Sequence, residues 1–73
     1  MTKLPQLRVK EIVMALKRLD FEHRRTTGSH IRLVHPDGRK VTVPMHKGDI
    51  PKGTLRSILR QAEISLDELL ANL

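Results

Sequence analysis

The stretch that decides the fold runs from His30 to His46 and reads HIRLVHPDGRKVTVPMH. Two runs in which apolar and polar residues alternate flank a turn sequence, Pro36-Asp37-Gly38. A period of two is typical of strands that bury one face. Pro-Asp-Gly favours a type I turn that closes with a glycine in the left-handed conformation. The stretch therefore predicts an antiparallel hairpin.

The length of the hairpin loop sets the register of its strands. A three-residue loop pairs His35 with Arg39, and the pairs that follow are Leu33 with Val41 and Ile31 with Val43. A two-residue loop would set Leu33 opposite Thr42 and divide the apolar residues between the two faces. We therefore expect the first register. It leaves four polar side chains on the open face of the sheet: His30, Arg32, Lys40 and Thr42.

The flanking sequence predicts helices on both sides of the sheet. From about Arg8 to Leu19 apolar residues recur at helical spacing, and a second periodic segment begins at about Thr54. Ser65 with Glu68 forms a capping box that opens a short third helix. A weaker strand is expected from Phe21 to about Thr26, joined to the hairpin by Thr27-Gly28-Ser29, and residues 47–53 are expected to form a loop.

These elements predict an α+β fold with the order α-β-β-β-α and a short C-terminal helix. Both main helices must bury their apolar stripes on the one apolar face of a three-stranded antiparallel sheet. This is also the element order of double-stranded RNA-binding domains, an analogy that does not by itself fix a function. At 73 residues the chain, residues 1–73, is expected to form a single domain.

The charge balance indicates a polyanionic partner. Fourteen Lys and Arg stand against eight Asp and Glu, a formal net charge of +6, which favours nucleic acid or an acidic protein. Phe21 is the only aromatic residue, so the stacking platforms of common single-strand binders are absent. Recognition of RNA would therefore run through phosphates, 2′-hydroxyls and shape.

Cysteine content, hydropathy and the N-terminal sequence indicate the cellular compartment and whether the chain associates with a membrane. There is no cysteine, and no apolar run approaches the roughly 18 residues that a membrane span needs. The N-terminus has no signal-peptide pattern. We expect a cytoplasmic protein with no membrane partner.

Four histidines are candidates for proton transfer, because histidine titrates near neutral pH. His30 is the strongest, since it starts a strand on the polar face beside Arg32. By alternation His46 shares that face and is the candidate for a second proton-transfer group. His23 is expected to be half-buried near Phe21, and His35 to be structural. Their spacing matches no ligand pattern and no carboxylate cluster accompanies them, so we expect no metal and no cofactor.

Basic residues that could hold phosphates fall into two groups. Lys52, Gly53 and Thr54 lead into the second predicted helix, whose free N–H groups favour an anion, and Arg56 and Arg60 extend that edge. The second group runs along the sheet and comprises Arg24, Arg25, Arg32, Arg39 and Lys40.

Four motifs together resemble the HicA-type mRNA interferase toxins. They are Gly28-Ser29-His30, HPDGR at residues 35–39, VTVPMH at residues 41–46 and GTLRSILRQA at residues 53–62. The resemblance covers nearly the whole chain, from the helix at Val9–Leu19 to Ser65. The Gly-Ser-His motif combined with the later GTLRSIL block is specific, whereas either motif alone would be weak.

The resemblance implies a double-stranded RNA-binding fold, ribosome-independent cleavage of mRNA and dependence on the histidine matched by His30. It also implies a HicB-type antitoxin that covers the active site, with no metal or cofactor. We accordingly count Ser29 among the RNA-binding candidates. The alternatives are a non-catalytic RNA-binding module of the same fold and a basic adaptor for an acidic protein; a helix-turn-helix DNA reader fits the central strands less well.

Two positions depart from the family pattern. Asp20 and Glu63 stand where the family usually has glycine, each just past the end of a helix. Glycine there supplies a left-handed C-terminal cap, and Asp tolerates that conformation better than Glu. We therefore expect the second main helix to close in a different way.

Overall fold

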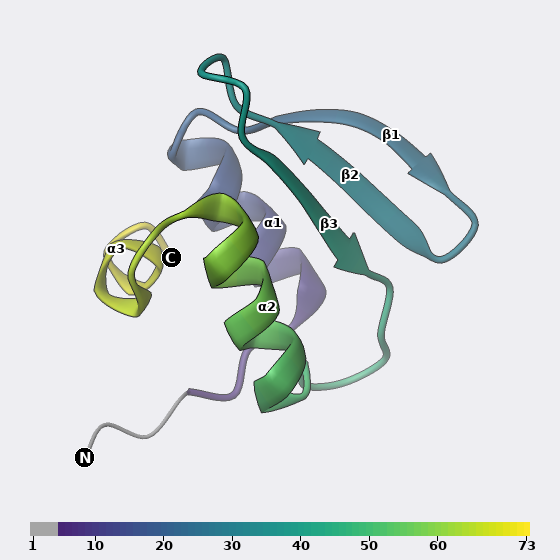
Figure 1. Cartoon of the computed structure of the whole chain (residues 1–73). Coiled ribbons are helices and arrows are strands. Elements are labelled where there is room, and N and C mark those ends of the chain that lie inside the picture. Colours follow the sequence, from purple (N-terminus) through teal and green to yellow (C-terminus); the bar gives the residue numbers. More distant parts are fainter. Residues whose placement is uncertain (1–4) are drawn as a thin grey trace.

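The computed structural model describes residues 5–73 and has the predicted order of elements (Figure 1). The elements are α1 (Val9–Arg18), β1 (Glu22–Thr27), β2 (His30–Val34), β3 (Lys40–Pro44), α2 (Lys52–Ala62) and α3 (Leu66–Ala71). The three strands form one antiparallel sheet in the order β1-β2-β3. The predicted α+β fold is confirmed.

The β2–β3 hairpin has the predicted register. The N–H of His35 donates to the carbonyl of Arg39 at 2.8 Å, and the N–H of Gly38 donates to the carbonyl of His35 at 2.9 Å. Gly38 has a φ of +102°, the left-handed conformation that the turn requires. Leu33 pairs with Val41 and Ile31 with Val43, so their apolar side chains share one face.

Strand β1 contains a bulge that the sequence pattern did not predict. Arg25 pairs with Arg32, but His23 pairs with Leu33, so Arg24 is an extra residue on the β1 side. The bulge reverses the alternation, and Phe21 turns into the core while Arg25 faces the open side. The expectation that His23 is half-buried is wrong: it is exposed, and its Nε2 lies 2.9 Å from Oγ1 of Thr26.

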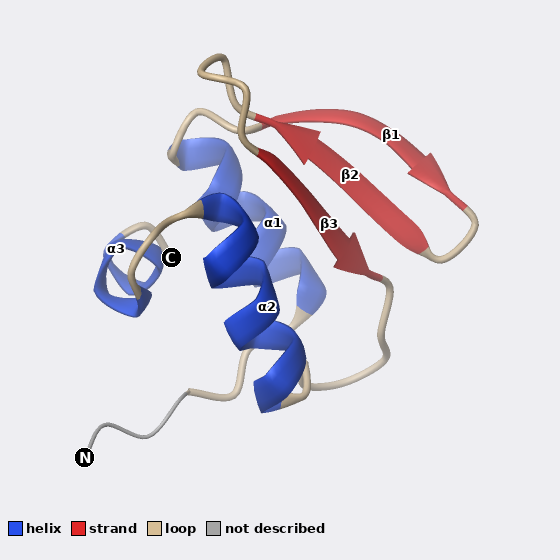
Figure 2. Cartoon of the chain, in the orientation of Figure 1, coloured by secondary structure: helices blue, strands red, loops and turns tan. Residues whose placement is uncertain are grey.

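Helices α1 and α2 cover one face of the sheet, and α3 lies beside them away from the strands (Figure 2). Helix α2 begins at Lys52, two residues before the predicted start. One hydrophobic core joins the layers, and its largest fully buried side chains are those of Phe21, Ile12, Leu16, Leu33, Leu55, Ile58 and Leu69. Every residue of β1 is exposed, so this strand contributes no buried side chain to the core.

Asp20 and Glu63, the two residues that depart from the glycine pattern of the resembled family, still adopt the left-handed conformation at the helix ends. Asp20 has a φ of +74° and Glu63 a φ of +55°. After α2 the N–H of Glu63 donates to the carbonyl of Arg60, and the N–H of Ile64 to that of Leu59. The expectation that α2 closes differently is therefore wrong. Glu63 adopts the left-handed conformation despite its strain, and the closing hydrogen bonds form as they would with glycine.

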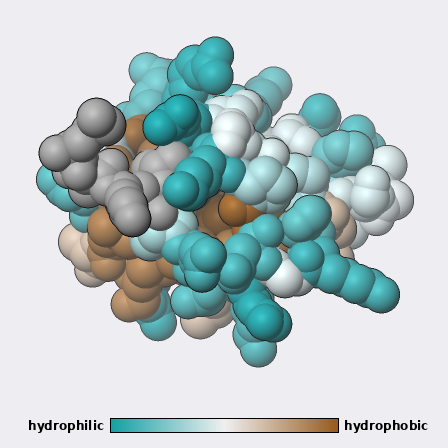
Figure 3. All heavy atoms as spheres, turned by 90° about the horizontal axis from the view of Figure 1, so that it is seen from below, coloured by the Kyte–Doolittle hydropathy of each residue, from teal (hydrophilic) through white to brown (hydrophobic). Residues whose placement is uncertain are grey.

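The outer surface is mostly hydrophilic on the face shown in Figure 3, with apolar atoms reaching the surface between charged and polar ones. The large apolar side chains that are exposed include those of Met14 and Met45. None of the helices in residues 5–73 is long and apolar enough to span a membrane.

Candidate functional site

Polar side chains from all three strands line a hollow on the open face of the sheet. Arg25, Arg32 and Thr42 form one row across the strands, and Thr27 and His30 form the next row toward the β1–β2 turn. We call this space, of about 360 Å³ and lined by these five residues, the open-face hollow. It lies on the side of the sheet opposite the helices.

Local backbone geometry places His30 in this hollow. The β1–β2 loop has two residues, Gly28 and Ser29, and Gly28 adopts a φ of +55° that glycine takes without strain. The short loop sets Thr27 directly opposite His30. The bulge at Arg24 then brings Arg25 to the same face, so the hollow depends on both the short loop and the bulge.

The open-face hollow concentrates positive charge. Arg25 and Arg32 are direct cross-strand neighbours, an arrangement of like charges that destabilises a sheet. In residues 5–73 the arginines whose side chains make hydrogen bonds are Arg18 and Arg39, and no carboxylate pairs with Arg25 or Arg32. A bound anion would relieve the repulsion between the two guanidinium groups.

The hollow also holds a free imidazole. Among residues 5–73 the histidines that make side-chain hydrogen bonds are His23 and His35, and His30 is exposed. Guanidinium groups bind phosphate oxygens in a bidentate manner, threonine hydroxyls donate to them, and an imidazole can take up or release a proton near neutral pH. This set of groups suits a phosphodiester.

The structure separates His46 from His30. Regular pairing of β3 ends at Pro44, so strand alternation no longer fixes the side on which His46 lies. His46 lines a groove beside α1 together with Ile31, whose side chain lies on the opposite face from His30 and Arg32. The expectation that His46 shares the open face with His30 is wrong.

The other sequence-predicted RNA-binding residues lie outside the hollow. Lys40 pairs with Val34 one row beyond Arg32, Arg24 is the bulge residue, and Ser29 lies in the β1–β2 turn, where its carbonyl accepts the N–H of Met45 at 2.6 Å. Lys52, Thr54, Arg56 and Arg60 belong to α2, which packs on the covered side of the sheet. The two predicted cationic groups therefore form separate surfaces.

Arg39, grouped with the phosphate-binding residues by its sequence position, has a structural role instead. Its Nε donates to Oδ2 of Asp37 at 2.7 Å, and its Nη1 donates to the carbonyl of Ala62 at 2.6 Å. The guanidinium carbon lies 5.2 Å from the centre of the Phe21 ring. Arg39 thus ties the hairpin turn to the C-terminus of α2.

Two residues of the hollow were not singled out from the sequence. The sequence pattern predicts that Thr27 belongs to the connection before β2 and that Thr42 lies on the open face, and it gives neither a role. The two-residue loop at Gly28-Ser29 could have identified Thr27 as the partner of His30. Thr42 is also held in place by α2, because its N–H donates to Oε1 of Gln61 at 3.0 Å.

Residues 5–73 contain no group of three or more His, Cys, Asp or Glu side chains arranged to hold a metal ion. The chain matches a protein-family model described as the HicA toxin of bacterial toxin–antitoxin systems, over residues 9–64. That range spans α1 to the residue after the left-handed cap of α2, and it includes every residue of the open-face hollow. No curated protein matches the chain at a significant level.

Proposed function

The chain belongs to the HicA toxin family of bacterial toxin–antitoxin systems, and on that premise we propose that it is an endoribonuclease that cleaves mRNA. The observation that carries the proposal is the open-face hollow, in which the free imidazole of His30 lies one row from the unpaired Arg25 and Arg32. The proposed activity requires neither a metal nor the ribosome, and it arrests growth.

In the proposed reaction the 2′-hydroxyl of the substrate attacks the adjacent phosphorus, and the bond to the 5′-oxygen of the next nucleotide breaks. His30 acts as the general base that removes the 2′-proton or as the general acid that protonates the leaving oxygen. Arg25 and Arg32 bind the non-bridging oxygens and stabilise the negative charge of the phosphorane. The hollow is open to solvent, so water is available for the other proton transfer.

Substrate binding is proposed to run through the RNA backbone. Phe21 is the only residue of the Phe, Tyr and Trp type and is buried, so the chain lacks the large aromatic platforms on which single-strand binders stack bases. Arg24, Ser29 and Lys40 flank the hollow and are proposed to contact neighbouring phosphates. Lys52, Thr54, Arg56 and Arg60 on α2 are proposed to hold a more distant part of the same RNA, since they do not line the hollow.

The family implies an antitoxin partner. We propose that this partner is a HicB-type antitoxin, that the toxin acts in the cytoplasm, and that residues 1–73 work as one toxin domain. Neutralisation requires that the antitoxin prevent RNA from reaching His30.

The test is cleavage of a defined mRNA by the purified protein in EDTA, compared with the His30→Ala variant. We expect wild-type protein to cut, and His30→Ala to bind RNA with unchanged affinity but not to cut. His23→Ala, which removes another exposed histidine of the sheet, should cut normally. Binding without cleavage by the wild type would identify a non-catalytic RNA-binding module, and activity lost in EDTA would contradict metal independence.

A further inference from the structure

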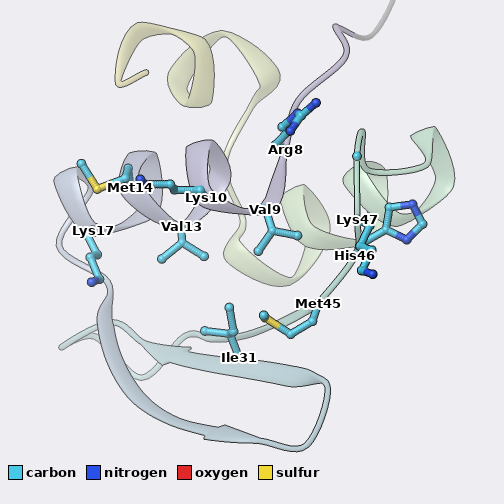
Figure 4. Close-up of a pocket in the computed structure, with 11 residues that line it drawn as sticks. Arg8, Val9, Lys10, Val13, Met14, Lys17, Ile31, Met45, His46 and Lys47 are labelled. Atoms are coloured by element: carbon cyan, nitrogen blue, oxygen red, sulfur yellow. The ribbon is translucent and has the colours of Figure 1, made fainter.

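A second surface lies on the opposite side of the sheet, between α1 and the strands. This α1 groove has a volume of about 670 Å³. Its floor is apolar and is formed by Val9, Val13, Ile31 and Met45, and Met14 lines one end of the groove. Figure 4 shows Val9 and Val13 pointing from α1 toward Ile31 of β2, with Met45 beside them.

The floor of the α1 groove is open to solvent. Met45 is 52% exposed and Met14 45% exposed, and both methionines line the groove. Methionine is flexible and polarizable and adapts to varied apolar partners, so it is common at surfaces that bind other proteins. Exposed methionines at both ends of a groove with two valines form the kind of apolar surface that marks a binding site.

The rim of the α1 groove is cationic. Arg8, Lys10, Lys17 and Lys47 line it, and none of the lining residues is acidic. Glu11, which precedes Ile12 on α1, is turned to the helix end, where its carboxylate accepts the N–H of Arg8 at 3.0 Å. A ligand that fits this groove must supply apolar side chains for the floor and negative charge for the rim.

We propose that the α1 groove binds an acidic amphipathic segment of a protein partner. This deepens the proposed function, because the antitoxin that the family implies is the partner it would serve. The segment would place apolar side chains against Val9, Val13 and Met45, and carboxylates near Lys10 and Lys17. This arrangement is typical of grooves that bind an amphipathic segment. The positive charge of the rim favours a partner of negative charge.

Two other occupants fit less well. RNA would place phosphates near the rim but would leave the apolar floor without a partner, since the one ring that lines the groove, the imidazole of His46, lies away from Val9 and Val13 (Figure 4). A second copy of the chain carries a net charge of +6, so its approach would be opposed by repulsion between like charges.

The position of the α1 groove has a consequence for how a partner binds. Ile31 contributes to the groove, whereas its neighbours His30 and Arg32 contribute to the open-face hollow on the other side of β2. A segment in the groove therefore leaves the hollow open. We expect this segment to anchor the partner, and a different part of the partner to block the RNA site.

The test uses NMR to measure the binding of two synthetic helical peptides to isotope-labelled full-length protein. Both peptides carry leucine at positions i, i+3, i+4 and i+7; one has glutamate at the remaining positions and the other lysine. We expect only the glutamate peptide to bind, to shift the resonances of Val9, Val13, Ile31 and Met45, and to leave those of His30 and Arg32 in place. Salt should weaken this binding by screening the rim.

Charge reversal provides the matched variants. Lys10→Glu with Lys17→Glu should weaken binding of the glutamate peptide at least tenfold, whereas Lys52→Glu with Arg56→Glu on α2 should not. All four side chains are exposed, and circular dichroism checks that the variants fold. Equal binding of both peptides, shifts centred on His30, or no effect of Lys10→Glu with Lys17→Glu would overturn the proposal.

Activity separates this proposal from the ribonuclease proposal. Lys10→Glu with Lys17→Glu should cleave RNA as the wild type does, and His30→Ala should bind the glutamate peptide as the wild type does. A loss of RNA affinity on Lys10→Glu with Lys17→Glu would show that the groove is part of the RNA site. Analytical ultracentrifugation measures whether the protein forms dimers. A dimer that Met14→Glu with Met45→Glu abolishes would show that a second copy of the chain covers the α1 groove.

Discussion

Arg25 of β1 lies directly opposite Arg32 of β2 on the uncovered face of the sheet, one row from His30. Neither guanidinium has a carboxylate partner within residues 5–73. Like charges in this position cost folding free energy, and only an anion from outside the sheet can compensate for them. The pair therefore links the stability of the strand pair to phosphate binding.

The first prediction concerns this pair and RNA affinity. Arg25→Ala and Arg32→Ala should each weaken RNA binding roughly tenfold or more, because a hydrogen bond to a charged group is worth about 1.5–3 kcal/mol. Each should also reduce the slope of log affinity against log salt by about 0.7, the value for one phosphate contact on a single strand. Binding titrations at several salt concentrations measure both. Lys17→Ala, on the other face, is the control; equal losses in all three variants would mean that the arginines act only through net charge.

The second prediction concerns the bulge at Arg24. Deleting Arg24 removes the extra residue, so either Phe21 leaves the core or Arg25 leaves the hollow. Loss of Phe21 from the core should cost about 3–5 kcal/mol, as for other large buried aromatics. Chemical denaturation measures the free energy of unfolding, and RNA binding reports the hollow. Arg24→Ala keeps the bulge and should change stability little; a deletion variant that is both stable and active would contradict this account.

The third prediction concerns the left-handed cap of α2. Glu63 adopts a φ of +55° and a ψ of +44°, a conformation that costs a residue with a Cβ about 1 kcal/mol relative to glycine. Glu63→Gly should therefore raise the free energy of unfolding by about that amount, less the entropy that glycine adds to the unfolded chain. Glu63→Ala keeps the Cβ and should give no gain. A stabilising Ala variant would point to the removed charge rather than to the backbone.

The fourth prediction concerns pH and the hairpin turn. The pKa of Asp37 is lowered from its ordinary value of 3.8, chiefly because its carboxylate accepts the backbone N–H of Arg39 and also pairs with the Arg39 side chain. Because the pKa of Asp37 is lower in the folded protein, its ionised carboxylate stabilises the fold at pH values above the ordinary pKa. This contribution disappears as the pH falls through the lowered pKa.

Thermal unfolding of the wild type and Asp37→Asn as a function of pH measures this contribution. The variant should melt at a lower temperature near pH 7, and the difference should shrink as the pH falls below 3.8. Because Asp37 is solvent-exposed, the effect should be modest and reduced by salt. A difference that persists unchanged in acid would show that the carboxylate charge does not stabilise the turn.

The sequence alone determined the register of the β2–β3 hairpin and hence the face that carries His30 and Arg32. A period-two pattern on both sides of a Pro-Asp-Gly turn allows one register that buries all the apolar residues together. Helical periodicity likewise determined α1 and α2, since only one face of each could be buried. The candidate catalytic histidine was found on these grounds together with the Gly-Ser-His motif.

Only the tertiary structure decided which residues from outside the β2–β3 hairpin join His30 and which predicted ones do not. Strand alternation assigns faces within an uninterrupted ladder, but it cannot show where the ladder is interrupted. The bulge at Arg24 brings Arg25 into the hollow, and the end of pairing at Pro44 releases His46 to the α1 groove. Arg39 is drawn instead to the C-terminus of α2. Each outcome depends on contacts between segments distant in sequence, which no local period encodes.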